Sequence, residues 1–182
     1  GHENKVEGKY SNAVGQKNVI KGNNSISIGS ENQSSSDLTE TIGHRNIVEG
    51  KGTSALGTEN IAKGYAVRTI GVENKVEGRF STVIGTRNNI IGDEGDTVMG
   101  DHNVVKGGNK HRKIFGYNNE ASDGDGQIAV GSYNKLKGHQ ATALGAGNEV
   151  TGKEATAVGH GNKAKQDFAL AYGTGNKVDG IG

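Results

Sequence analysis

The sequence contains no cysteine, no proline and no tryptophan, and aromatic residues make up only 4% of its 182 residues. Without cysteine it has neither a disulfide framework nor thiolate chemistry. The lack of proline is typical of a chain whose residues donate backbone hydrogen bonds in β-ladders. No apolar run approaches the roughly 20 residues that a membrane-spanning helix needs. The formal net charge of +1 argues against nucleic acid as a partner, because nucleic acid selects a basic surface.

Glycine, by contrast, is abundant, and its 32 copies recur at fixed offsets. A 14-residue unit opens with glycine and has asparagine at its fourth position. Units begin at Gly1, Gly15, Gly29, Gly43, Gly57, Gly71, Gly85, Gly100, Gly116, Gly131, Gly145, Gly159 and Gly173. The units opening at Gly85 and Gly116 are each longer by one residue, and the unit opening at Gly100 is longer by two. Such a period is the signature of a solenoid, in which each unit stacks only on its neighbours.

Apolar and polar residues alternate at two places in each unit, which predicts two short strands per unit. One strand surrounds position 6, as at Val76, and the other covers positions 11 to 14, as at 141–144. Glycine or asparagine lies between them, and both tolerate positive φ at sharp corners. Stacked units would form two parallel sheets, so we predict an all-β, parallel β-roll solenoid with 14-residue rungs. We interpret the asparagine column as structural, with each amide closing a turn and bonding the asparagines above and below. The alternative is a ligand-binding ladder.

The second strand has one small-residue face and one larger apolar column. Positions 11 and 13 are small or β-branched, whereas position 12 includes Glu40 and Arg68, whose charges cannot enter a narrow core. We therefore place position 14 on the outside of the roll. This column contains Val14, Ile28, Ile42, Leu56, Ile70, Ile84, Leu144 and Val158. Because covering each aliphatic side chain is worth about 1.5–3 kcal/mol, the column predicts an interface between copies of the chain.

Segments such as 141–152 (ATALGAGNEVTG) and 155–159 (ATAVG) resemble the head repeats of trimeric autotransporter adhesins, the YadA-like head. The resemblance covers essentially the whole chain, although asparagine replaces the serine that often follows G-x-x in that family. It implies a left-handed parallel β-roll, a homotrimer and display on a Gram-negative cell surface. It further implies one head over residues 1–182 of about thirteen rungs, irregular at 85–130. No neck, stalk or membrane anchor is expected in this segment, so anchoring to the outer membrane would come from other regions.

The resemblance implies an adhesin head that binds a host receptor such as a CEACAM, or a matrix protein. The alternative is a structural spacer of a surface fibre that mediates autoaggregation. The period argues against acyltransferases of the left-handed β-helix type, which advance in hexapeptide steps. Position 12 has no column of threonines, as an ice-binding solenoid would need. We expect no enzyme activity, no cofactor, no metal and no membrane contact by this segment. The Asp-Gly-Asp-Gly sequence at 123–126 is interpreted as a turn, with a calcium loop as the alternative.

A regular solenoid presents the same surface at every rung, so we expect the receptor site where the pattern breaks, between 85 and 130. The predicted site consists of Asp93, Glu94, Asp96, Lys110, His111, Arg112, Lys113 and Tyr117. Two alternatives remain: the basic segment 110–113 is a solvated loop, or binding uses exposed aromatic residues such as Tyr10, Tyr65 or Phe80.

Overall fold

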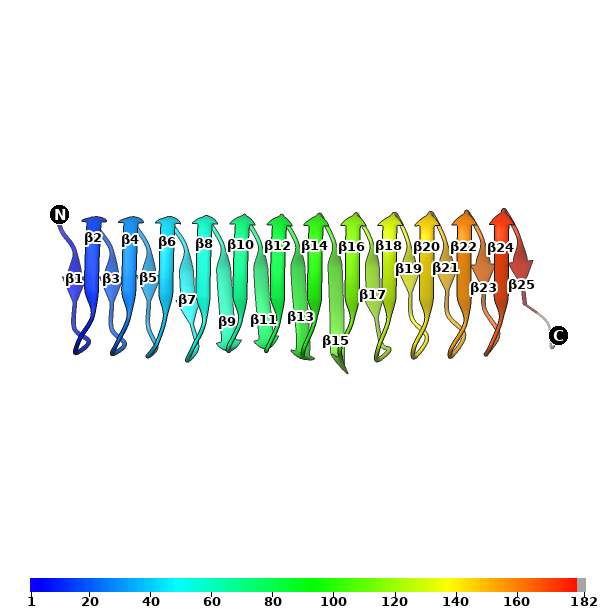
Figure 1. Ribbon diagram of the computed structural model, residues 1–182, viewed down its shortest axis with the longest axis horizontal. Helices are drawn as coiled ribbons and strands as arrows, with labels where there is room; N and C mark the ends of the chain where they lie inside the picture. Colours follow the sequence, from blue (N-terminus) through cyan, green and yellow to red (C-terminus); the bar gives the residue numbers. More distant parts are fainter. Residues whose placement is uncertain (180–182) are drawn as a thin grey trace. The chain divides into compact units, whose positions relative to one another are not determined.

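The computed structural model describes residues 1–179, including all of their side chains except those of Asp93 and residues 108–110. The described residues form β-strands and turns, without a helix. The chain divides into two compact units, Gly1–Asn88 and Asn89–Gly182, which are built in the same way. Within each unit the odd-numbered strands form one parallel sheet, the odd sheet, and the even-numbered strands form a second, the even sheet. Strands of the two sheets point in opposite directions, so each turn of the chain runs along one sheet and returns along the other (Figure 1).

In the first unit, successive strands of a sheet pair exactly one repeat apart, as between Ile70 and Ile84. The odd sheet contains β1 (Lys5–Val6), β3 (Val19–Ile20), β5 (Gln33–Ser34), β7 (Ile47–Glu49), β9 (Ile61–Tyr65) and β11 (Lys75–Arg79). The even sheet contains β2 (Asn12–Gln16), β4 (Ile26–Ser30), β6 (Glu40–His44), β8 (Ser54–Thr58), β10 (Arg68–Val72) and β12 (Thr82–Thr86).

In the second unit, the rungs between Asn89 and Ile128 are wider. The odd sheet contains β13 (Asn89–Glu94), β15 (Val104–Lys110), β17 (Glu120–Ser122), β19 (Lys135–Leu136), β21 (Glu149–Val150), β23 (Lys163–Ala164) and β25 (Lys177–Val178). The even sheet contains β14 (Thr97–Asp101), β16 (Lys113–Tyr117), β18 (Ile128–Ser132), β20 (Thr142–Ala146), β22 (Thr156–His160) and β24 (Leu170–Thr174). The predicted all-β solenoid, with one rung for each copy of the sequence repeat, is confirmed.

The core of each unit is a single narrow column of side chains between the two sheets. Positions 6, 11 and 13 point into it, and Val76, Val67 and Thr69 are fully buried there. Ile70, at position 14, faces outward and keeps 42% of its surface exposed. This alternation follows from the two-residue period of a strand. The predicted orientation, with small residues inside and the larger apolar column outside, is correct.

The asparagines of the inner rungs tie three rungs together, as Asn60 does. The Asn60 backbone N and Nδ2 donate to Oδ1 of Asn46 at 3.1 and 3.0 Å, and Nδ2 also donates to the Gly71 carbonyl at 2.7 Å. Asn60 Oδ1 in turn accepts the backbone N and Nδ2 of Asn74 at 3.2 and 3.0 Å. The same pattern links Asn119, Asn134 and Asn148 in the second unit. The structural interpretation of the column is therefore confirmed.

The corner residue with positive φ is the one before the asparagine. Lys17, Glu31 and Arg45 have φ values of 54°, 57° and 53°. Glycine takes this position in other units, as at Gly147 and Gly161 with φ values of 66° and 64°. The expectation that glycine or asparagine would take this conformation therefore holds only in part, because the asparagine is occupied in the buried ladder and several units have a larger residue before it. A left-handed residue costs roughly 1–2 kcal/mol, and the ladder bonds at each rung offset that cost. Glycine is required at position 1, where Gly57 has a φ of 124° and a methyl group would overlap the Gly71 carbonyl oxygen.

We expect Asn60→Ala to destabilise the first unit strongly. It leaves the buried backbone N of Asn74 and the Gly71 carbonyl without the partners they have now. An unsatisfied buried polar group costs about 1–3 kcal/mol, so the loss should reach about 2–6 kcal/mol. Urea denaturation would measure it, with Asn23→Ala at an exposed corner as the control. Equal losses for the two variants would contradict a stabilising role of the buried ladder.

Candidate functional site

The rungs are widened at the corner that leads into the even sheet. In this region β13 pairs with β15 one residue beyond the regular repeat, with Asn89 opposite Val104, and the register shifts after Gly92. The next even-sheet pairing, Thr97 with Lys113, is offset by a further residue. The extra residues therefore lie between the odd-sheet strand and the even-sheet strand of each wide rung. At these rungs position 11 is occupied by Asp96, Arg112 and Gln127 instead of a serine, threonine, alanine or valine.

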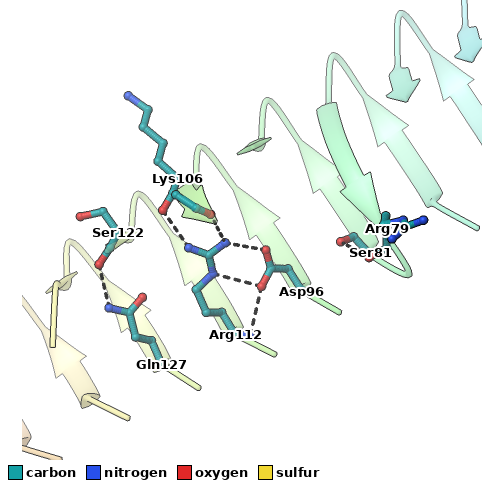
Figure 2. Close-up of polar contacts among 8 residues, drawn as sticks. Arg79, Ser81, Asp96, Lys106, Arg112, Ser122 and Gln127 are labelled. Carbon is teal, nitrogen blue, oxygen red and sulfur yellow. Dashed lines mark hydrogen bonds and ion pairs between the residues drawn. The ribbon is translucent and has the colours of Figure 1, made fainter. Parts of the chain in front are cut away.

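Asp96 and Arg112 form a buried ion pair inside the widened core (Figure 2). Arg112 Nη2 donates to Asp96 Oδ2 at 2.8 Å, and Nε donates to Oδ1 at 3.0 Å. Both side chains are 0% exposed. The remaining guanidinium donors reach the carbonyls of Lys106 at 2.8 Å and Gly107 at 3.2 Å. Arg112 thus fills the extra space and holds the β15 backbone in place.

Gln127 continues the same column in the following rung (Figure 2). Its Nε2 donates to the Ser122 carbonyl at 2.9 Å and to the Gly138 carbonyl at 3.1 Å. In a regular rung the same task is done by a hydroxyl, as when Thr53 Oγ1 donates to the Gly64 carbonyl at 2.8 Å. Longer side chains therefore replace short ones where the rung is wider. The sequence signal was available, since these three long polar residues stand in a column of small ones.

The predicted receptor residues do not form one surface patch. Asp96 and Arg112 are buried, so the prediction that they contact a receptor is wrong; the physical reason is that the insertion widens the core at their position. The side chains of Asp93 and Lys110 lie outside the described residues. Glu94 is partly exposed and His111 exposed, and the His111 backbone N donates to the Glu94 carbonyl at 3.0 Å.

The two remaining residues are exposed but lie at opposite ends of one strand. Lys113 begins β16 and Tyr117 ends it. At roughly 3.3 Å per residue, four steps separate them by about 13 Å. Lys113 shares the outer face of the even sheet with the apolar column. Tyr117 belongs instead to the corner after that sheet.

At that corner three rings form a ladder across successive rungs. The His102 and Tyr117 centroids are 5.7 Å apart, and those of Tyr117 and Tyr133 are 5.3 Å apart at an interplanar angle of 77°. This edge-to-face arrangement is the favoured one for aromatic pairs. The pKa of the Tyr133 phenol is raised by its hydrogen bond with Tyr117, by the charge of that phenol and by partial desolvation. The two phenols thus interact with each other at this corner.

The second surface feature is the apolar column on the even sheet. In the first unit it runs through Val14, Ile28, Ile42, Leu56, Ile70 and Ile84, and in the second through Met99, Phe115, Val130, Leu144, Val158 and Tyr172. All of these side chains are exposed or half-buried. The column is continuous within each unit because the strands pair in register. It is an apolar stripe of the kind that marks a protein interface.

The fold defines the class of protein: a parallel β-solenoid with 14-residue rungs and an outer apolar column. The sequence model of the YadA head domain repeat matches residues 151–176 in two copies. The match and the 14-residue rungs together fit a YadA-like head. No curated protein matches the chain significantly. Among the described residues, no helix is long and apolar enough to cross a membrane. The YadA head family consists of non-enzymatic, adhesive domains of bacterial surface autotransporters.

Proposed function

We propose that this chain is the head of a homotrimeric adhesin that attaches bacteria to host cells through a CEACAM-type receptor or a matrix protein. The observation that carries the proposal is the apolar column on the even sheet of each unit. A stripe of this kind is stable in water only when covered, and a second copy of the same stripe is complementary to it. Three copies would bring their columns together around one axis, leaving the charged odd sheets in solvent.

The odd sheet is suited to solvent because its outward positions are charged and paired between rungs. Lys63 lies 3.1 Å from Glu49, and Lys135 lies 3.4 Å from Glu120. Such exposed pairs contribute little to stability. They keep this part of the outward face hydrated, although Val19, Ile47 and Ile61 also lie on it half-buried. The receptor surface in this proposal therefore lies on the corners and the odd sheet of the widened rungs, where His111 and Tyr117 are exposed and Glu94 is partly exposed.

We expect a head with regularised rungs to remain trimeric and to lose adhesion. Residues 93–96 and 108–113 would be replaced together with the sequence of a regular unit, because each segment holds one partner of the Asp96–Arg112 pair. Adhesion to purified receptor and matrix proteins should weaken tenfold or more, about 1.4 kcal/mol. The control exchanges the regular corner 137–140 for residues 151–154. Unchanged adhesion of the regularised head would place the site at exposed aromatic corners such as Tyr10, Tyr65 or Phe80.

A further inference from the structure

A groove in the second unit lies beside the aromatic ladder. It has a volume of about 390 Å³ and is lined by Val104, Lys106, Asn118, Glu120, Tyr133 and Lys135, together with two asparagines of the buried ladder. One wall is formed by Asn118 and Tyr133, each of which directly precedes an asparagine of the buried ladder. The other wall is the outer face of β15, β17 and β19. The groove therefore lies on the odd sheet, away from the apolar column, and stays open when that column is covered.

The first unit has the same groove at the same repeat positions, with different chemistry. Its volume is about 380 Å³, and its corner wall is made of Lys17, Glu31 and Arg45. Arg45 Nε lies 2.9 Å from Glu31, and its Nη1 lies 3.5 Å from Glu59. The hydrogen bond from Arg45 lowers the pKa of the Glu31 carboxyl, so the pair stays ionised. This groove has its charges already satisfied and offers no ring.

The groove of the second unit differs in three ways that point to a ligand. Tyr133, which takes the place of Arg45, is 56% exposed and presents a ring to solvent. Lys106 forms no ion pair with any residue whose side chain is described, whereas Lys135 is paired with Glu120. Asn118 is exposed at the corner, and its amide makes no hydrogen bond to any described group. The site thus combines a ring, an amide and one unpaired cation.

The buried ion pair sets the position of Lys106. Arg112 Nη1 donates to the Lys106 carbonyl at 2.8 Å, which anchors the backbone of β15 from inside the core. Figure 2 shows the Lys106 side chain extending away from this cluster. The buried ion pair of the widened rungs therefore fixes β15, the strand that carries Lys106 into the lining of the groove.

We propose that this groove binds a short glycan that ends in a carboxylate-bearing sugar. An exposed tyrosine ring stacks on the apolar face of a pyranose, and the Asn118 amide can donate to and accept from its hydroxyls. Lys106 supplies one charge-assisted bond to the carboxylate. Because Lys106 is the one cation lining the groove that has no ion pair with a described side chain, the groove suits a single carboxylate rather than a sulfated polysaccharide, which needs a row of cations. This inference rests on the proposed adhesive function and assigns a ligand class to the head.

The test is titration of the purified head with 3′-sialyllactose, and with lactose as the uncharged counterpart. We expect the acidic sugar to bind at least tenfold more tightly. Tyr133→Ala should weaken binding tenfold or more, and Tyr133→Phe should keep most of it because the ring remains. Lys106→Gln should remove the preference for the acidic sugar. The matched control, Arg45→Ala in the groove of the first unit, should leave binding unchanged.

Equal binding of the two sugars would overturn the proposal, as would an equal loss in the Arg45→Ala variant. If heparin fragments or a peptide bound at Tyr133 more tightly than 3′-sialyllactose, the proposed ligand class would be wrong. Thermal melting of each variant shows whether the fold is retained. Adhesion of the wild-type head to receptor and matrix proteins is measured in parallel. Protein adhesion without sugar binding would contradict only the proposed glycan site. Sugar binding without protein adhesion would contradict only the proposed protein receptor.

Discussion

Ile70→Asp should abolish the proposed trimer. Ile70 lies on β10 in the middle of the apolar column, in register with Leu56 and Ile84. In the proposed assembly the substitution places three carboxylates close together without partners. Removing each from water costs several kcal/mol, and their mutual repulsion adds to that cost. Sedimentation equilibrium should therefore show the mass of a single chain, or an unfolded chain, where the wild type has the mass of three.

The matched control is Gln33→Asp, which introduces the same charge on the outer face of the odd sheet. This side chain is exposed, so the variant should keep the mass of three chains. A stable, folded monomer of the wild type would contradict the proposed assembly. So would an Ile70→Asp variant that remains trimeric, because the column would then face solvent in the assembly.

Arg112→Met should destabilise the second unit by about 3–5 kcal/mol, because it leaves the Asp96 carboxylate buried without its cation. The carbonyls of Lys106 and Gly107 also lose their donors. Urea denaturation at one fixed protein concentration would measure the loss, since the stability of an oligomer depends on concentration.

The double variant Asp96→Leu with Arg112→Met tests the mechanism. It removes both charges, so it should be more stable than Arg112→Met alone. Arg87→Ala is the surface control, because it breaks an exposed pair with Glu73 at 2.7 Å and should cause a much smaller loss. If Arg112→Met and Arg87→Ala lost equal stability, the buried pair would not be what holds the wide rungs.

Much of the architecture could be predicted from the sequence because the same repeat pattern occurs thirteen times along the chain. Asparagine at position 4 of every unit, together with the constant period, required stacked, in-register strands. Charged residues at position 12, such as Glu40 and Arg68, set which face of the second strand turns outward. These inferences held because period and alternation are local properties of a strand.

The candidate site was less predictable because an insertion changes which way a side chain points. Asp96 and Arg112 stand among charged residues and have the composition of a surface loop. The structure buries them, because the insertion widens the core and the two oppositely charged side chains fill it while satisfying each other's hydrogen bonds. Their composition is the same as that of Lys113, which is exposed one residue later, and only their place in the position-11 column distinguishes them.

The sequence by itself thus determined the repeat, the two strands per rung, the asparagine ladder and the outward apolar column, since each follows from periodicity. Only the tertiary structure decided that Asp96 and Arg112 pair inside the core. It also placed Tyr117 at the other end of β16 from Lys113, in contact with the rings of His102 and Tyr133. It also decided that Lys106, which forms no ion pair with a described side chain, lies beside the aromatic ladder. These relations depend on the register between rungs of different lengths. Where the spacing changes, the stacking of one rung on the next fixes each residue's neighbours.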